Sequence, residues 1–477
     1  MDWAQHARDP VILEQFVLES LGQASYLLAA EKTGEALVVD ARRDVDVYLQ
    51  AARRRGLRLT HAVDTHQHND YVTGIRELLE RSDEVQLLAG ARAEVGYPAR
   101  RLRDRERLEM GELLIEVLPT PGHTPEHISL LVMDRSRGDE PALLLSGGAL
   151  LVGDVARPDL LGDRDHTLEM AGAMWRTLRD AILTLPDHVE VYPTHVAGSL
   201  CGGQIASRSS TTIGYERRLN QLLSCMSSQE RFVNECLKLD SLPAVPPYWR
   251  RARRMNQQGP APLGALAEPP ALRVDAVARA KDEGAVIVDC RSPEAFGSGH
   301  IEDALNVGAG NAFPTWAGSV VPAETPVVLV LEDASDLWEV SWSLLRIGYD
   351  LPEGWLAGGM YAWRTSGRDI VAMPQWTVRE LRRQLESDRR LLVLDVRQPH
   401  EWASGHIARA CHITGAQLVE RAAELPVDRP IAVVCSSGYR SSVAASVLAR
   451  RGHLMVANVL GGMLAWTHAG FPVVEGG

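Results

Sequence analysis

Short apolar runs separated by polar turns dominate the first part of the chain. The runs at 16–18, 25–30, 36–39 and 57–63 have the length and composition of β-strands, and the stretch 44–55 is predicted to form a helix. The sequence therefore predicts a first part rich in strands, in which histidine-containing turns follow the run 57–63.

The second part of the chain has a different pattern. Apolar runs such as 391–394 and 431–434 alternate with helical stretches such as 441–451, which is typical of a parallel sheet covered by helices. The pattern also repeats, which indicates two copies of one α/β module. The matching segments are 286–294 and 392–400, 298–301 and 404–407, and 356–363 and 459–466.

The segment 242–270 separates the two parts and contains seven prolines. Proline fixes the backbone and removes a hydrogen-bond donor, so we interpret this segment as a linker. Its arginine cluster, which comprises Arg250, Arg251, Arg253 and Arg254, is interpreted as a solvated or domain-contact patch. A chain of 477 residues is too long for one hydrophobic core. The predicted domains are therefore 1–241, 271–371 and 375–477.

Composition excludes several classes of protein. The net charge of -12 argues against a general nucleic-acid binder, which needs a positive field. No apolar run is long enough to cross a bilayer and the first ten residues do not look like a signal peptide, so we expect a cytoplasmic protein. The six cysteines show no Cys-x-x-Cys pair, so we expect free thiols rather than a disulfide framework or a zinc ribbon.

Possible metal ligands occur in a fixed order along the first part. They are His66, His68 and Asp70 in the turn after the run 57–63, then His123, Asp154 and His195, each set in or beside a turn rich in glycine or proline. Imidazole and carboxylate groups suit zinc, iron or manganese. The sequence therefore predicts a metal site built from several loops.

This order resembles the motif of the metallo-β-lactamase superfamily, His-x-His-x-Asp-His followed by His, Asp and His, over about half of the chain. The resemblance implies a multidomain α/β protein whose first domain is an αββα sandwich. Tyr71 replaces the last histidine of the first motif. A phenol is a poor substitute for imidazole as a ligand of a second metal, so a single metal ion is expected.

The resemblance extends to the persulfide dioxygenases of this superfamily. It implies one Fe(II) per chain, held by His66, His123 and Asp154 in the manner of a facial triad. His68, Asp70 and His195 are then expected to orient ligands or water, or to serve as alternative ligands.

Three further residues are candidate substrate contacts: Arg157, Tyr71 and Cys201. Arg157 either holds a substrate carboxylate or forms a salt bridge. Cys201 either binds sulfane sulfur or is a buried structural thiol.

A second candidate site follows the run 431–434, where Cys435-Ser-Ser-Gly-Tyr-Arg440-Ser precedes a helical stretch. Backbone N–H groups at such a loop stabilise a thiolate, and Arg440 supplies positive charge for an anionic sulfur compound. The loop resembles that of rhodaneses, which implies that Cys435 carries a persulfide. In the first module Leu331 aligns with Cys435, and the residues after it include carboxylates but no arginine. That copy is predicted to be inactive.

Together the domains resemble the fusions of a persulfide dioxygenase with a sulfurtransferase. The expected partners are a low-molecular-weight thiol persulfide, O2, sulfite and thiosulfate, and the expected assembly is a homo-oligomer, by default a dimer. The first alternative is a thioester hydrolase similar to glyoxalase II, with zinc in place of iron. A non-enzymatic persulfide carrier or sensor is the second.

Overall fold

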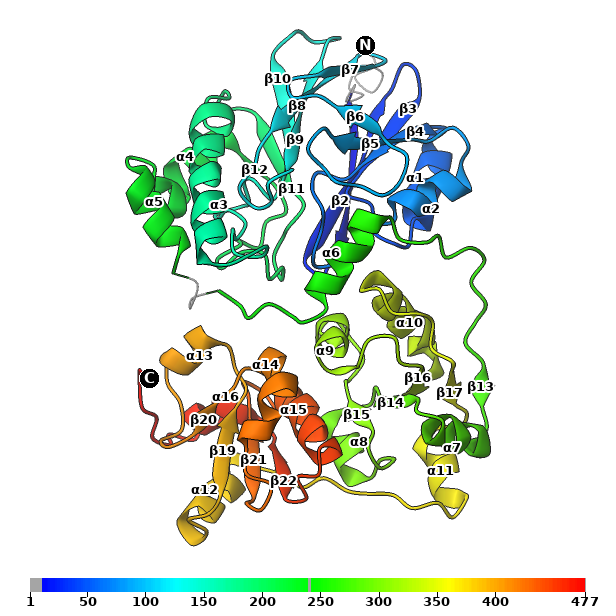
Figure 1. Ribbon diagram of the computed structural model, residues 1–477, viewed down its shortest axis with the longest axis vertical. Coiled ribbons are helices and arrows are strands. Elements are labelled where there is room, and N and C mark those ends of the chain that lie inside the picture. Colours follow the sequence, from blue (N-terminus) through cyan, green and yellow to red (C-terminus); the bar gives the residue numbers. More distant parts are fainter. Residues whose placement is uncertain (1–10, 239–241, 477) are drawn as a thin grey trace, which may run out of the picture. The chain divides into compact units, whose positions relative to one another are not determined.

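The computed structural model describes residues 11–238 and 242–476 (Figure 1). These residues form two compact units. The first comprises the described residues up to 242 together with 249–266, and the second comprises 243–248 and the residues from 267 onward.

The first unit is built on two mixed sheets of six strands each. In the order of pairing, the strands of the first sheet are β1 (Val11–Leu18), β2 (Gln23–Ala30), β3 (Glu35–Val39), β4 (Arg58–Val63), β5 (Gln86–Gly90) and β6 (Arg100–Leu102). Those of the second are β12 (Thr211–Thr212), β11 (Glu190–Pro193), β10 (Pro141–Gly147), β9 (Ile128–Asp134), β8 (Leu113–Pro119) and β7 (Arg107–Met110).

Helices cover the outer faces of both sheets. They are α1 (Asp46–Arg55), α2 (Ile75–Arg81), α3 (Arg164–Thr177) with its continuation η2 (Leu178–Ile182), α4 (Ile213–Leu219), η3 (Leu222–Cys225), α5 (Gln229–Cys236) and α6 (Trp249–Gln258). Strand β2 explains the layering, because all eight of its residues are buried. Tyr26 and Leu28 face the core between the sheets, whereas Leu27 and Ala29 face the layer of α1 and α2. The predicted αββα sandwich is confirmed.

The second unit contains two parallel sheets of five strands each, and their strand orders correspond. The first sheet consists of β13 (Ala271–Leu272), β17 (Gly354–Leu356), β16 (Val327–Val330), β14 (Val286–Asp289) and β15 (Leu305–Asn306). The second consists of β18 (Gln375–Trp376), β22 (Val456–Val459), β21 (Ile431–Val434), β19 (Leu392–Asp395) and β20 (Cys411–His412). The predicted pair of parallel α/β modules is thereby confirmed.

Each module has its own set of helices. In the first they are α7 (Val274–Asp282), α8 (Pro293–Ser298), α9 (Phe313–Val320), η5 (Ala334–Asp336), α10 (Leu337–Arg346) and α11 (Gly359–Thr365). In the second they are α12 (Val378–Ser387), α13 (Pro399–Ala403), α14 (Gly415–Arg421), η6 (Ala422–Glu424), α15 (Tyr439–Arg450) and α16 (Gly462–His468).

The segment interpreted as a linker is partly ordered as helix α6, which clusters with the first unit. Trp249, Ala252 and Asn256 are buried on one face of this helix, as their spacing of three and four residues requires. Arg253 differs from the expectation of a solvated patch, because only 12% of its side chain is exposed. Part of the segment 242–270 therefore belongs to the sandwich.

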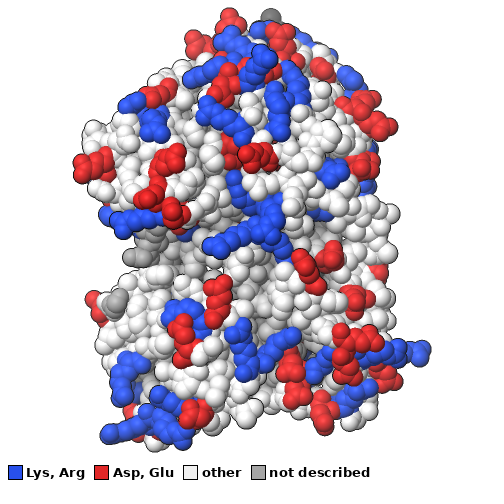
Figure 2. Space-filling model, viewed as in Figure 1, with Lys and Arg blue, Asp and Glu red and all other residues white. Residues whose placement is uncertain are grey.

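Other expectations concern the surface and the thiols. Within the described residues, no helix combines the length and the hydropathy needed to span a bilayer. All six cysteines are free. Side chains of both charges are interspersed on the face shown in Figure 2.

Candidate metal centre and sulfur-transfer loop

The predicted metal ligands lie in loops that follow four strands of the sandwich. His66, His68 and Asp70 follow β4, whereas the other candidates follow β8, β10 and β11. Because each loop leaves the carboxyl end of its strand, the loops meet at one edge of the two sheets. His66, His123 and His195 are at most 3% exposed there.

Three imidazoles converge at this edge. The ligand atoms of His66, His123 and His195 all lie within 4.8 Å of one another, and the Nε2 atoms of His66 and His195 are 3.4 Å apart. Other polar groups fix two of the rings, since Nδ1 of His66 lies 2.9 Å from Thr65 Oγ1 and Nδ1 of His123 lies 2.8 Å from the carbonyl oxygen of Arg157. These contacts leave both Nε2 atoms for the centre of the cluster.

Two of the three imidazoles favour the neutral form. Burial, together with the neighbouring histidines, holds the pKa values of His66 and His123 well below the ordinary value. A neutral ring whose Nδ1 carries the proton offers the lone pair of Nε2 to a metal ion. For His195 burial opposes the charged form, but the neighbouring Cys201 and Asp70 raise its pKa well above the ordinary value.

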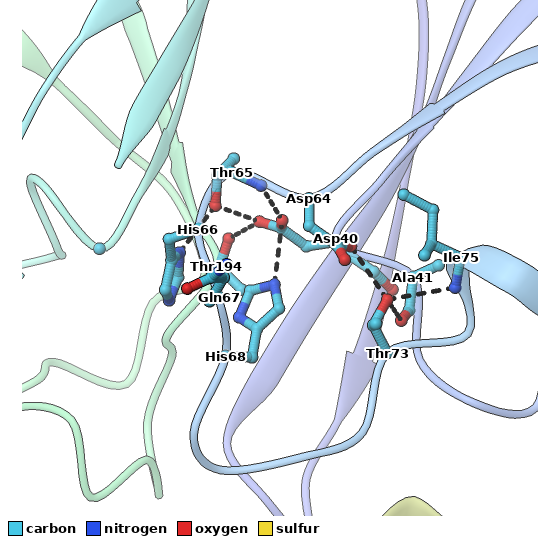
Figure 3. Close-up of polar contacts among 12 residues, drawn as sticks. Asp40, Ala41, Asp64, Thr65, His66, Gln67, His68, Thr73, Ile75 and Thr194 are labelled. Atoms are coloured by element: carbon cyan, nitrogen blue, oxygen red, sulfur yellow. Dashed lines mark hydrogen bonds and ion pairs between the residues drawn. The ribbon is translucent and has the colours of Figure 1, made fainter. Parts of the chain in front are cut away.

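Asp40, which belongs to none of the motifs recognised in the sequence, organises the loop that carries His66 (Figure 3). This buried residue follows β3 in the left-handed conformation, with φ of 56°. Its carboxylate accepts hydrogen bonds from the backbone N–H of Thr65 at 2.6 Å and the hydroxyl of Thr65 at 2.9 Å, and also from the hydroxyl of Thr194. Asp40 therefore ties the loop after β4 to the residue that precedes His195.

His68 and Tyr71 turn toward Asp40. Nε2 of His68 lies 3.2 Å from Oδ1 of Asp40, and its ring stacks on Tyr71 with 4.5 Å between centroids. The Tyr71 hydroxyl donates to the carbonyl oxygen of Asp40 at 3.1 Å. The phenol, which was expected to contact substrate, is thus fully buried and bonded to the backbone.

His127 supports the cluster and was also missed as a candidate. Its ring stacks on His66 at 5.0 Å, and its Nε2 accepts the backbone N–H of Gly148 at 2.8 Å. Burial lowers the pKa of His127 to about 3. Gly147 is required beside it, because a Cβ there would lie 2.4 Å from Nε2 of His127. The Gly147-Gly148 pair at the end of β10 was a signal for this close approach.

Asp154 lies outside the group of three histidines. Its Oδ2 accepts the backbone N–H groups of Gly203 and Gln204 at 2.8 and 2.9 Å, and its Oδ1 accepts that of Val155 at 2.9 Å. The structure thus brings His66 and His123 together with His195, and it anchors the Asp154 carboxylate on the loop after Cys201.

Asp70 and Cys201 form a second group with His195. The ligand atoms of these three buried residues also lie within 4.8 Å of one another. Oδ2 of Asp70 is 3.5 Å from Nδ1 of His195, on the side of the ring opposite His66. Cys201 is therefore a direct neighbour of His195, and it is buried, so its position fits both expected alternatives, a thiol that binds sulfane sulfur and a structural thiol.

Arg157 contributes mainly through its backbone and a salt bridge. Its guanidinium group forms two hydrogen bonds of 2.7 and 2.8 Å with Asp159, while its carbonyl oxygen holds His123. The side chain is buried and its charge is partnered within the chain. Of the two expected alternatives, the structure contains the salt bridge.

Helix α6 contacts the loop after β4 and stabilises it. The buried side-chain amide of Asn256 donates to the carbonyl oxygens of His68 and Tyr71, both at 2.8 Å, and accepts the N–H of Thr73 at 2.9 Å. One side chain thereby satisfies three backbone groups of the loop after β4. Since α6 lies in the expected linker, no pattern along the chain indicated this role.

Cys435 lies at the carboxyl end of β21 and its side chain is fully buried. Its Sγ accepts hydrogen bonds from the Gly438 N–H at 3.1 Å and the Ser441 hydroxyl at 3.3 Å. Gly462 passes close above the loop, since a Cβ there would lie 2.3 Å from the carbonyl oxygen of Cys435. The loop therefore presents two donors that stabilise a thiolate.

Arg440 is paired within the module. Its guanidinium group makes two hydrogen bonds with Glu401, of 2.6 and 2.7 Å, and 20% of its side chain is exposed. Glu401 therefore balances part of the positive charge that was expected to face an anionic sulfur compound.

The first module lacks these features. Leu331 follows β16 as Cys435 follows β21, and it is buried. On the repeat alignment, Ala295 stands in the place of Glu401 and Asp336 in the place of Arg440. Both members of the ion pair are thus replaced together with the cysteine.

Two family models match the chain. The model described as "Metallo-beta-lactamase superfamily" matches residues 20–195. The model described as "Rhodanese-like domain" matches twice, at residues 273–366 and 377–469.

Known proteins are similar to the chain as well. The mitochondrial persulfide dioxygenase ETHE1 of Bos taurus is 30% identical over 240 residues, which cover 48% of this chain and 82% of that relative. A hydroxyacylglutathione hydrolase of Polaromonas is 31% identical over 174 residues, 36% of this chain and 61% of that protein. The crystal structure of a metallo-beta-lactamase from Staphylococcus aureus subsp. aureus COL is 29% identical, covers 73% of this chain and 99% of that chain, and has a TM-score of 0.66. Through its first half the chain therefore belongs to the persulfide dioxygenase family within the metallo-beta-lactamase superfamily, and two rhodanese-like domains follow that half.

Proposed function

We propose that the first domain oxidises a low-molecular-weight thiol persulfide, such as glutathione persulfide, with O2 at a single ferrous ion. The persulfide, one O2 and one water yield sulfite, which contains the terminal sulfur, together with the free thiol and two protons. We further propose that Cys435 transfers sulfur between thiosulfate, sulfite and persulfides. Family membership carries the first proposal, and the two donors to Cys435 Sγ carry the second.

The residues at the edge of the sandwich fit a bound metal ion. Two buried imidazoles with lowered pKa values direct their Nε2 atoms to a common centre, and hydrogen bonds at Nδ1 fix their orientation. Without a bound cation, the facing Nε2 atoms of His66 and His195 would have to share a proton. Bound iron would supply the site at which the persulfide and O2 meet, with iron as the redox centre.

His66 and His123 are two ligands in every arrangement that we consider. We propose Asp154 as the third, because of the resemblance of the motif to that of persulfide dioxygenases. His195 is the second candidate, because its Nε2 lies 3.4 Å from that of His66. Either set leaves positions for substrate, as iron dioxygenation requires.

The other residues of the site hold and shield this centre. Thr65 and the carbonyl group of Arg157 fix the His66 and His123 rings, and Asp40 fixes the loop itself. Among the three candidate substrate contacts, Cys201 is the one supported by position, since it belongs to the group with His195. We propose that its thiol lies beside the sulfane sulfur of the substrate.

Sulfur transfer would proceed in two steps. The Cys435 thiolate attacks the outer sulfur of thiosulfate, the S–S bond breaks and sulfite leaves with the electron pair. The resulting persulfide then gives its outer sulfur to an acceptor thiolate, which restores Cys435. The Gly438 N–H and the Ser441 hydroxyl stabilise the thiolate at both ends of this cycle.

The test is to purify the full chain without air, measure bound iron and zinc, and follow O2 uptake with glutathione persulfide. We expect about one iron per chain and consumption of O2 with formation of sulfite. His66→Ala should abolish uptake, whereas Cys435→Ser should leave uptake intact and abolish transfer from thiosulfate. Bound zinc with hydrolysis of a glutathione thioester and no O2 uptake would overturn the proposal.

A thioester hydrolase is the second candidate function, because of the likeness to hydroxyacylglutathione hydrolases. Tyr71 disfavours it. This phenol replaces a histidine of the superfamily motif and is bonded to the carbonyl oxygen of Asp40, so it does not supply a ligand for a second metal ion.

A further inference from the structure

The first rhodanese-like module has no cysteine at the catalytic position, yet it contacts the helix that follows Cys435. Strand β15 of the first module lies beside α15 of the second in the same unit (Figure 1). These contacts are polar and buried, which gives them a defined geometry.

Asn306, at the end of β15, is the centre of this contact and is 1% exposed. Within its own module its side-chain amide donates to the carbonyl oxygens of Asp289 and Arg291, both at 3.0 Å. Toward the other module its Oδ1 accepts the Ser442 hydroxyl at 2.5 Å, and its backbone N–H donates to Ser446 Oγ at 3.0 Å. Asn306 therefore links the strand ends of the first module to two successive turns of α15.

Tyr439 makes the second contact from within the catalytic loop itself. Its hydroxyl donates to the carbonyl oxygen of Gly308 in the first module at 2.8 Å. Gly308 is closely packed against the ring, because a Cβ there would lie 3.1 Å from Cε2 of Tyr439. A larger residue at position 308 would push the ring and the loop away.

The two donors to Cys435 are adjacent to these anchored residues. Gly438 directly precedes Tyr439, and Ser441 directly precedes Ser442. The start of the loop is held differently, by N–H groups of the second module: those of Met463 and Leu464 donate to the carbonyl groups of Cys435 and Ser436. The second module thus fixes the cysteine, and the first module fixes the segment that carries the donors.

We propose that the first rhodanese-like module positions the thiolate-stabilising donors of Cys435, and that Asn306 is the positioning residue through which it does so. The inference rests on the proposed sulfur transfer at Cys435. It gives the module that lacks a cysteine at the catalytic position a role in the reaction without chemistry of its own. Displacement of α15 would lengthen the Gly438 and Ser441 hydrogen bonds to Sγ, so the thiolate would form less readily.

The test uses the full chain with Asn306→Ala and Tyr439→Phe. The readout is the rate of Cys435 alkylation by iodoacetamide across pH, followed by mass spectrometry, alongside sulfur transfer from thiosulfate to cyanide. We expect alkylation of Asn306→Ala at neutral pH to be about five-fold slower, with its midpoint shifted to higher pH, because a hydrogen bond to a charged group is weakened. The alkylation midpoint of Tyr439→Phe should shift in the same direction, but by a smaller amount.

Arg450→Ala is the matched control. It removes a hydrogen bond to the carbonyl oxygen of Asp303 at the far end of α15, so it weakens the same contact away from Cys435. This control should keep the alkylation profile of the unmodified chain. If Asn306→Ala does not fold, Tyr439→Phe decides the question by itself.

The outcomes separate the two claims. Absence of transfer in the unmodified chain would overturn the proposed sulfur transfer, whereas the alkylation profile tests the positioning directly. Folded variants with an unchanged alkylation midpoint and an unchanged transfer rate would overturn the positioning role of the first module.

Discussion

The Nε2 atoms of His66 and His195 lie 3.4 Å apart inside a fully buried cluster. Nδ1 of His66 faces Thr65, and Nδ1 of His195 faces Asp70. Two such nitrogens are stabilised either by a shared proton or by a cation between them. This relationship makes His195 a competitor of Asp154 for the third ligand position.

Replacement of each candidate ligand should resolve that competition. His66→Ala and His123→Ala are expected to lower bound iron and O2 uptake by about 100-fold or more, because each removes a ligand from an open site. With Asp154 as third ligand, Asp154→Ala should have the same effect and His195→Ala should retain iron. Iron analysis of the four purified variants provides the measurement, and iron retained by Asp154→Ala but lost by His195→Ala would reverse the assignment.

Asn256→Ala should loosen the loop that carries the metal ligands. The change leaves the carbonyl groups of His68 and Tyr71 and the N–H of Thr73 buried without their partner, which is expected to cost about 2 kcal/mol or more of stability. Iron affinity should fall about ten-fold, as for other residues that orient a ligand.

Asn256→Asp is the sharper variant, because it keeps an acceptor for Thr73 but places a carboxylate against two carbonyl groups. It should lower stability and iron affinity at least as much as Asn256→Ala does. Exposed Arg254 on the same helix provides the control, and Arg254→Ala should leave both unfolding and iron titration unchanged. Full iron affinity in both Asn256 variants would show that α6 has no part in holding the site.

Much of the fold was predictable because its signals are local. The strands of the sandwich and the two modules follow from apolar runs of suitable length, and the repeat predicts that the modules share one fold. Helix α6 was missed because prolines flank it on both sides, and its buried face becomes apparent only against the loop that Asn256 contacts.

The site residues also fall into two groups, those with a local signal in the sequence and those without one. His66 and His123 could be proposed from the sequence because they stand in a series of residues that resembles the metallo-β-lactamase motif. Asp40 and His127 could not, because their roles depend on contacts with loops far away in sequence. The sequence leaves open whether Arg157 pairs with a carboxylate of the substrate or of the chain, and the structure shows it bonded to Asp159.

The two cysteines near the proposed reaction centres should separate the activities. Cys435→Ser is expected to abolish transfer from thiosulfate while O2 uptake persists. Cys201→Ser should lower O2 uptake with glutathione persulfide about ten-fold, because its thiol borders His195, and should leave transfer unchanged. Both rates are measured on the same preparations. If Cys201→Ser takes up O2 at the normal rate, the Cys201 side chain has only a structural role.

The Glu401–Arg440 ion pair should make stability depend on pH. Burial opposes ionisation of Glu401, but the hydrogen bonds from Arg440 and the Gln398 N–H hold its pKa below the ordinary value. A carboxyl group with a lowered pKa in the folded state stabilises the fold above its unfolded pKa, and this contribution disappears as the pH falls through the folded pKa. Glu401→Gln should therefore cost about 1 kcal/mol at neutral pH, since the pair is partly exposed.

The difference between Glu401→Gln and the unmodified chain should shrink as the pH falls below about 4. Urea unfolding at a series of pH values measures it, and Glu386→Gln is the control, because its pair with Arg382 is exposed on α12. Since the first module has Ala295 and Asp336 at the two corresponding positions, the pH-dependent loss should belong to the second module alone. A difference that stays constant from neutral pH to about pH 3 would mean that Glu401 acts through packing rather than through its charge.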